Sequence, residues 1–156
     1  MLSKELITFL GSMIPIGELR TSIPLALRAG LSPFQAFFWS VLGNMVVGLV
    51  LLLILTPLSR FLEDHFYVLN RFFNWLFDRT KRRHSQKIEN WGSLALIGFV
   101  GIPLPMTGVW TGALVAFVFG IPFKKAFPAI ICGALIAGVI VTLVSLGLVS
   151  LKETLF

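Results

Sequence analysis

Glu18 and Arg20 are the most informative residues of the chain for chemistry, because both are ionisable and lie in a largely apolar stretch. Ionised groups in apolar surroundings are costly unless they are paired or hydrated, and they usually mark function. Two residues apart on a helix, they point to different sides, so a direct ion pair would need unwound backbone. Two interpretations stay open: an ion pair that holds a turn together, or a site where Arg20 receives an anionic group while Glu18 positions it or relays a proton.

A second set of polar groups lies in segment 105–112, where Thr107 and Thr111 carry hydroxyls and Trp110 an indole N–H. Two glycines four residues apart in this segment are also typical of close helix packing. Asn44 places an amide in an apolar stretch, and a hydrogen bond to a neighbouring helix explains it before contact with a bound molecule does. The candidate binding residues are Glu18, Arg20, Asn44, Thr107, Trp110 and Thr111.

Enzyme signatures are missing from the sequence. The two aspartates and two histidines all lie between positions 64 and 84, and no phosphate-binding glycine loop, nucleophile elbow or His-Glu metal motif occurs. Cys132 is the single cysteine, which excludes a disulfide framework and a cysteine-based metal site. We therefore expect no enzyme, no metal and no cofactor, with coupling to a proton or an ion left open.

The elements that position these residues are those of a membrane protein. The chain has 156 residues, 56% of them hydrophobic and 13% charged. Charges are absent between Arg28 and Arg60, between Glu89 and Lys124, and between Lys125 and Lys152. A bilayer-spanning helix needs about 20 apolar residues, and each of these gaps is longer than that. The net charge of +6 comes largely from a basic cluster beside hydrophobic segments, so we expect contact with membrane lipids and not with nucleic acid.

An internal repeat organises the chain. When the sequence is compared with itself at an offset of 90 residues, segment 11–48 aligns with segment 101–138 without a gap and with nine identities. Five of them are glycine or proline, the residues that fix backbone shape. These are Gly11/Gly101, Pro15/Pro105, Gly30/Gly120, Gly43/Gly133 and Gly48/Gly138. The pattern predicts a duplicated structural unit.

Each unit begins with an apolar stretch that proline and glycine interrupt. Such a break at membrane depth must face protein or water, because lipid cannot satisfy the freed backbone groups. A kinked spanning helix is one interpretation, and the favoured one is a re-entrant hairpin, since paired interruptions in two halves are typical of transporter sites. The expected residues of the hairpin turns are Pro15, Gly17, Pro24, Pro103, Pro105, Gly108 and Gly112.

The predicted fold is an all-α integral membrane protein with two inverted repeats, each a re-entrant helical hairpin plus one transmembrane helix. The first repeat covers residues 1–57, the second covers 92–156, and an amphipathic, basic linker helix covers 58–91. Nine of the thirteen Lys and Arg residues fall on the linker side, which the positive-inside rule makes cytoplasmic. We expect a multi-pass protein of the cell's inner (cytoplasmic) membrane. Because two small units can hardly enclose a pathway, we also expect a homodimer.

Several of these motifs are similar to a known family. Glu18-Leu-Arg20 with Ile23-Pro24, Gly43-Asn44, and segment 102–112 resemble the small multidrug export family, which is distantly similar to the DedA membrane proteins. The resemblance implies export of a small amphipathic or anionic, or lipid-linked, substrate. It leaves as alternatives a DedA-type translocase or scramblase of lipid-carrier phosphates, and a non-transporting membrane scaffold. Met106 stands where family members often have glycine.

Overall fold

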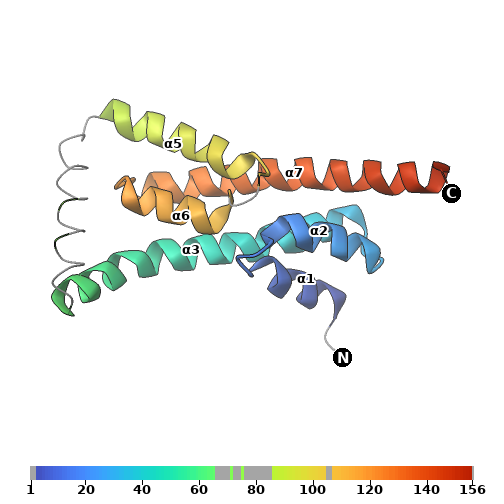
Figure 1. Cartoon of the computed structure of the whole chain (residues 1–156), viewed down its shortest axis with the longest axis horizontal. Coiled ribbons are helices and arrows are strands. Elements are labelled where there is room, and N and C mark those ends of the chain that lie inside the picture. The colour runs from blue at the N-terminus through green and yellow to red at the C-terminus, as the bar shows by residue number, and fades with distance from the viewer. Residues whose placement is uncertain (1–2, 66–70, 72–74, 76–85, 105–106, 156) are drawn as a thin grey trace.

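The computed structural model describes residues 3–65, 71, 75, 86–104 and 107–155, and these residues form six helices and no strand. The helices, labelled as in Figure 1, are α1 (Lys4–Ser12), α2 (Glu18–Arg28), α3 (Pro33–His65), α5 (Gln86–Gly101), α6 (Val109–Val118) and α7 (Phe123–Leu155). The predicted all-α class is confirmed. Most of the predicted linker lies outside the described residues; its ends belong to helices, since α3 continues past position 57 to His65 and α5 begins at Gln86.

Helices α3 and α7 form the long axis of the molecule, and each has 33 residues. A methyl group added at Gly48 of α3 would lie 3.4 Å from Ile130 of α7, and one added at Gly138 of α7 would lie 3.0 Å from Val41 of α3. As residue numbers rise along α3 they fall along α7, so the two helices pack side by side in opposite directions (Figure 1). Their segments Pro33–Leu55 and Phe123–Ser150 are long and apolar enough to cross a membrane.

The short helices form two hairpins, α1–α2 and α5–α6, that lie against this pair. Each hairpin passes to its long helix through the same glycine turn. Gly30 and Gly120 have φ of +88° and +64°, a left-handed conformation that glycine adopts without steric cost. In each turn the next residue donates a hydrogen bond five positions back, Leu31 to Ala26 at 3.1 Å and Ile121 to Ala116 at 2.9 Å. Gly30 and Gly120 are one of the identical pairs of the sequence repeat, so the repeat has a structural basis here.

A second pair of repeat glycines fixes the packing of each hairpin on its long helix. A methyl group at Gly43 of α3 would lie 2.5 Å from the carbonyl oxygen of Phe9 in α1. A methyl group at Gly133 of α7 would lie 2.6 Å from Cβ of Val100 in α5. Both crossings are therefore possible only because no side chain intervenes. The equivalent glycines bring the equivalent helices together.

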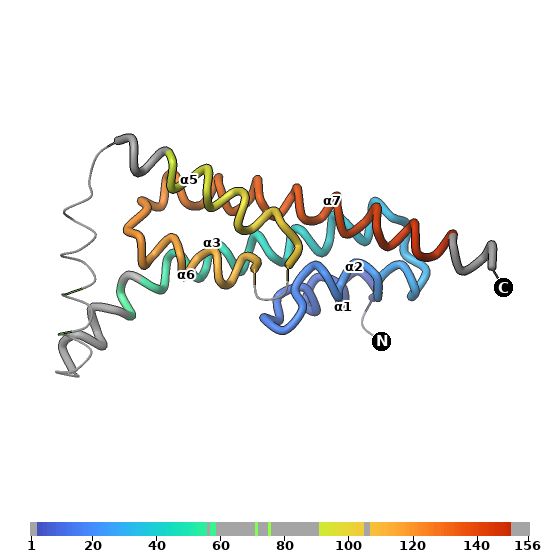
Figure 2. The backbone as a smooth tube through the Cα atoms, turned by 45° about the horizontal axis from the view of Figure 1, so that its top comes forward, coloured from blue at the N-terminus to red at the C-terminus, as the bar shows by residue number. Residues whose placement is uncertain are grey.

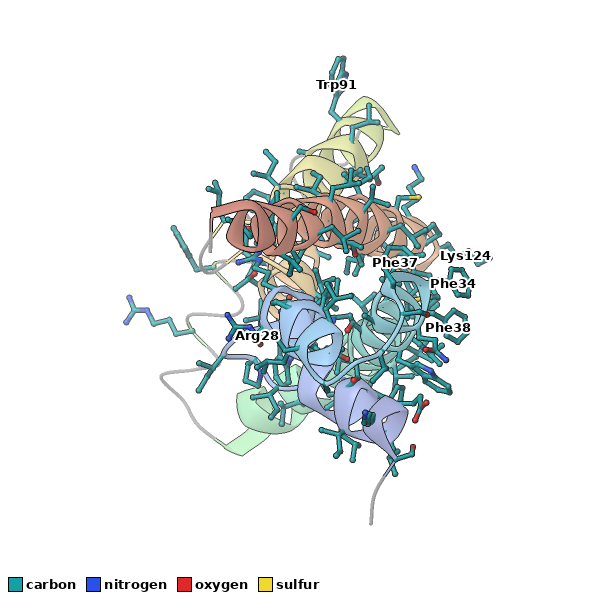
Figure 3. All side chains as sticks on the ribbon, turned by 90° about the vertical axis from the view of Figure 1, so that its right-hand side faces the viewer. Arg28, Phe34, Phe37, Phe38, Trp91 and Lys124 are labelled. Carbon is teal, nitrogen blue, oxygen red and sulfur yellow. The ribbon has the colours of Figure 1, made fainter. Side chains whose placement is uncertain are left out.

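The outer surface of the helices is apolar. Figure 3, which looks along the long axis, shows Phe34 and Phe38 of α3 pointing away from the packed helices, and 74% of the Phe34 side chain is exposed. Exposed leucine, isoleucine and valine side chains continue along α5 and α7. The buried core is instead rich in alanine, including the repeat pairs Ala26/Ala116 and Ala36/Ala126. Small buried residues with large exposed apolar ones are typical of helices packed within lipid.

Candidate functional site

The turns of the two hairpins meet near the middle of the long helices (Figures 1 and 2). One turn joins α1 to α2 around residues 13–17, and the other joins α5 to α6 around residues 102–108. We call this meeting place the hairpin junction, and define it by Met13, Glu18, Arg20, Leu104, Thr107, Gly108, Val109 and Trp110. It collects most of the polar side chains that the sequence singled out.

Glu18 caps the first turn of the opposite hairpin's helix. Its Oε2 accepts a hydrogen bond from the amide of Val109 at 3.2 Å, and its Oε1 accepts one from the amide of Trp110 at 3.1 Å. The first amides of a helix have no partner within the helix and carry its positive dipole end, so a carboxylate there is favourable. Gly108, just before α6, cannot cap with a side chain, and a methyl group added there would clash with the Glu18 carboxylate. Glu18 thus supplies, from more than 90 residues away in the sequence, the cap that Gly108 cannot provide.

The backbone of Glu18 is strained. Its φ of +49° is the one positive value among the non-glycine residues that the structure describes. A side chain in this left-handed region typically costs on the order of 1–3 kcal/mol and persists where the surroundings hold it. The two hydrogen bonds to α6 provide that hold.

Arg20 reaches the opposite turn rather than its neighbour Glu18. Its Nη1 donates to the carbonyl oxygen of Leu104, and its Nη2 donates to Oγ1 of Thr107 at 2.9 Å. Within the described part of the chain no ion pair joins Arg20 to Glu18; each of them binds the other hairpin instead. The sequence prediction that a direct pair would need unwound backbone is consistent with this, since both residues lie in α2 and bind different groups.

Trp110 makes the reciprocal contact. Its Nε1 donates to the carbonyl oxygen of Met13 at 3.1 Å, so the second hairpin also binds the turn of the first. Trp110 and Arg20 occupy equivalent positions in the two repeats, and so do Gly108 and Glu18. Gly108 lies against its equivalent Glu18, whereas Arg20 and Trp110 each contact the turn of the opposite hairpin. The charged side chains of these pairs belong to the first hairpin.

The remaining predicted residues lie beside the junction or serve local structure. The Thr111 hydroxyl accepts from the Gly108 amide at 3.0 Å, which is a cap within its own hairpin. Asn44 is completely buried on α3 and donates to the Ser40 carbonyl at 3.0 Å. Gly112 packs α6 against α5, since a methyl group there would lie 2.5 Å from Val100. Gly108 and Gly112 thus allow two different close contacts.

The remaining residues predicted for the hairpin turns are three prolines within the described residues, Pro105 and Gly17. Pro15 and Gly17 lie in the first turn, Pro103 lies in the second, and Pro24 lies inside α2. Gly17 precedes α2, and a methyl group there would clash with the Thr21 side chain. Pro105 lies outside the described residues.

This geometry can be compared with known proteins. Residues 18–140, more than three quarters of the chain, match the model of the family described as "Putative small multi-drug export protein". The chain belongs to this family. The match begins at Glu18 and includes every described residue of the hairpin junction except Met13. With its apolar helices, this member of the small multi-drug export family is a membrane protein.

No curated protein and no solved structure matches the chain. The similarity to DedA proteins has no support among these comparisons and stays a prediction. The sequence resemblance to the small multi-drug export family is confirmed.

The sequence did not predict which main-chain groups the candidate side chains bind in the junction. The amides of Val109 and Trp110 and the carbonyls of Met13 and Leu104 are the partners of the predicted side chains. No residue type reveals which backbone groups a distant side chain will meet. One sequence signal could have indicated this contact: Gly108 is equivalent to Glu18 in the repeat. Glycine has no side chain, so it leaves space for the Glu18 carboxylate and leaves the start of α6 without a side-chain cap.

Proposed function

We propose that this protein is an exporter whose two hairpins are re-entrant and whose hairpin junction is the gate and the binding site for the substrate. Helix lengths support the re-entrant arrangement. Helices α1, α2 and α6 have 9, 11 and 10 residues. At 1.5 Å per residue each is roughly 14–17 Å long, about half of the ~30 Å hydrocarbon layer. Helix α5 has 16 residues, and its apolar part is Trp91–Gly101, so it is also shorter than the layer. Each hairpin would therefore enter the membrane, turn near its middle and leave on the same side.

The opposite directions of α3 and α7 support inverted repeats. Hairpin α1–α2 lies toward the end of the molecule that carries both termini, and hairpin α5–α6 lies toward the other end (Figure 1). In this arrangement the linker side, with most of the Lys and Arg residues, is cytoplasmic, and the termini are external. With its linker side in the cytoplasm, the protein would lie in the cell's inner (cytoplasmic) membrane.

The observation that carries the proposal is the set of hydrogen bonds across the junction. Glu18 makes two, Arg20 makes two and Trp110 makes one, all from one hairpin to the other. These polar groups lie where two interrupted segments meet between the long helices, the arrangement in which transporters bind substrate and open alternately to either side. Breaking such bonds would separate the hairpins without unfolding either one.

The junction also indicates what could compete for its groups. The α6 amides hold a carboxylate in this conformation, so an anionic group on a substrate could take the place of Glu18 there. The Arg20 guanidinium uses two of its five N–H groups in the contacts described and could bind the same anion. We therefore propose a small amphipathic substrate with an anionic group, free or lipid-linked. We also expect a homodimer, because the described helices are few for enclosing a pathway.

Reconstituted liposomes test this function. Efflux of carboxyfluorescein, efflux of ethidium, and flipping of a fluorescent anionic phospholipid would be measured with wild-type protein and with Arg20→Lys. Exposed Arg28→Lys in the same helix is the matched control. We expect transport of an anionic probe that Arg20→Lys lowers at least tenfold and Arg28→Lys leaves unchanged, because an ammonium cannot bridge two acceptors as a guanidinium does.

The three probes distinguish an exporter from a lipid translocase and from a scaffold. Flipping of the phospholipid without efflux of the dyes would indicate a lipid translocase. Movement of none of the three probes by folded, reconstituted protein would contradict transport of this substrate class and favour a scaffold.

A further inference from the structure

A buried polar seam runs beside the hairpin junction, and the proposed gate does not use it. It consists of Thr8 and Ser12 in α1, Ser22 in α2, and Ser40 and Asn44 in α3. All five residues are buried, and Ser12, Ser40 and Asn44 have no exposed surface. Polar groups so placed in an apolar core need hydrogen bonds, because leaving one unsatisfied is unfavourable.

The hydroxyl protons of the seam are already used. Ser22 donates to the Thr8 carbonyl at 2.7 Å, Ser40 donates to Ser22 Oγ at 3.1 Å, and Ser12 donates to the Phe9 carbonyl at 2.7 Å. What remains on these side chains is acceptor capacity, the lone pairs of uncharged oxygens. A group that binds here must therefore donate hydrogen bonds or carry positive charge.

Asn44 provides the unsatisfied oxygen. Its Nδ2 donates to the Ser40 carbonyl at 3.0 Å, which fixes the orientation of the amide, since the reverse orientation would face two oxygens together. Its Oδ1 is the one buried side-chain atom, among the residues that the structure describes, with no hydrogen-bond partner.

The position of Asn44 on α3 directs it toward the seam and the junction. Ser40, Asn44 and Gly48 are spaced four residues apart and share one face of the helix. Ser40 meets Ser22 of α2 on this face, and Gly48 meets Val109 at the start of α6, where a methyl group would lie 3.0 Å away. Asn44 therefore lies at the end of the seam that is nearest to the hairpin junction.

The second repeat packs the same helices without these polar groups. Ser40 is equivalent to Ile130 and Asn44 to Ala134, and all four residues are fully buried or nearly so. Ser22 is equivalent to Gly112. Since an apolar version of the same core exists in the same chain, the polar groups are not required to build the repeat.

We propose that Asn44 Oδ1, with the Ser40 and Ser12 hydroxyl oxygens, forms a binding site for a sodium ion. Transporters coordinate sodium at the C-terminal ends of interrupted helices, and α1 ends at Ser12 within the seam. The absence of exposed surface on the three ligand residues limits the occupant to the size of a small ion or a single water. A water would satisfy the same oxygens through its two O–H groups, so the sodium measurement below distinguishes the cation from a water.

Binding is tested on the purified chain without any substrate. Thermal unfolding would be measured in sodium chloride and in choline chloride at equal ionic strength. We expect a saturable, sodium-specific rise in Tm, because an ion that binds only the folded chain stabilises it by mass action. Asn44→Ala, which copies Ala134, should abolish the rise. Thr142→Val is the control, because it removes a hydroxyl that bonds within α7, to the Gly138 carbonyl at 2.7 Å.

Ser40→Ala keeps the test decisive if Asn44→Ala does not fold. It should leave a sodium effect that needs about tenfold more salt, the loss expected when one ligand oxygen is removed. Equal Tm in sodium and choline for the wild-type chain would mean that the seam holds water only, and it would overturn the proposal. An unchanged sodium effect in folded Asn44→Ala would overturn it too. A role of this ion in driving export rests on the proposed function, whereas the binding measurement does not, so the two can fail separately.

Discussion

At the scale of single residues, Glu18 both holds the two hairpins together and has a strained backbone. Its carboxylate satisfies the Val109 and Trp110 amides of the opposite hairpin, and its backbone adopts a left-handed conformation. A residue 7% exposed that holds another helix's first turn contributes to the fold whether or not it also contacts a substrate. Structural and functional roles of this carboxylate are therefore tested by different variants.

Glu18→Gln should destabilise the protein, because an amide has one acceptor oxygen and can satisfy one α6 amide well but not both. We expect a loss of about 1–3 kcal/mol in the free energy of unfolding, the cost of an unsatisfied buried donor. Glu5→Gln in the first turn of α1 is the matched control. Thermal unfolding in detergent measures both, and an equal change in the two variants would contradict a special role of Glu18.

Removing both charges should not restore what removing one destroys. Glu18 and Arg20 bind different groups of the opposite hairpin, so the double variant Glu18→Gln with Arg20→Met leaves both sets of partners unsatisfied. We expect it to be less stable than either single variant. A double variant as stable as wild type would instead indicate a buried ion pair, because such pairs are often replaced together at little cost.

At the scale of helices, the repeat glycines decide how closely the hairpins approach the long helices. Gly43 and Gly133 each lie against a neighbouring helix with no room for a methyl group. Gly147 of α7, by contrast, has nothing within 4 Å of an added methyl group. The same substitution should therefore have opposite effects at these positions.

Gly43→Ala and Gly133→Ala should each lower stability, by about 1–3 kcal/mol for overpacking. Gly147→Ala should raise it by up to ~1 kcal/mol, because alanine favours a helix more than glycine does. Thermal unfolding of the three variants measures the difference. Similar Tm values for all three would mean that the close crossings do not form.

Much of the helical layout could be predicted from the sequence, and particular residues show why. The pairs Gly30/Gly120 and Gly43/Gly133 recur at one spacing, so the sequence predicted a duplicated unit, but it did not show that the first pair forms turns and the second forms close contacts. The partners of Glu18, Arg20 and Trp110 could not be predicted, since they are backbone groups about 90 residues away. For the seam around Asn44, the sequence gives the hydroxyl-bearing residues, but it does not show that they are buried together.

At the scale of the whole molecule, the inverted arrangement predicts that Ser3 and Ser85 face opposite sides of the membrane. In a Cys132→Ser background, a cysteine at Ser3 should react with a membrane-impermeant thiol reagent in intact cells, and one at Ser85 should react only after the membrane is opened. Four full spans would instead place both the amino terminus and the linker inside. Equal protection of both cysteines in intact cells would therefore contradict the re-entrant arrangement.

The central claim, that the hairpin junction opens during transport, is tested most directly by locking it. With Cys132 replaced by serine, cysteines at Met13 and Trp110, which now hydrogen-bond across the junction at 3.1 Å, would be joined by a short, reducible cross-linker in liposomes. The untreated double-cysteine protein sets the reference rate, because Trp110→Cys itself removes one contact of the junction. Each single-cysteine variant, compared before and after treatment, is the control for the reagent. We predict that efflux of the anionic probe falls from the reference rate to none when the two hairpins are joined, that treatment leaves the rate of each control unchanged, and that reduction restores the reference rate. Unchanged efflux through a fully cross-linked protein would contradict the claim.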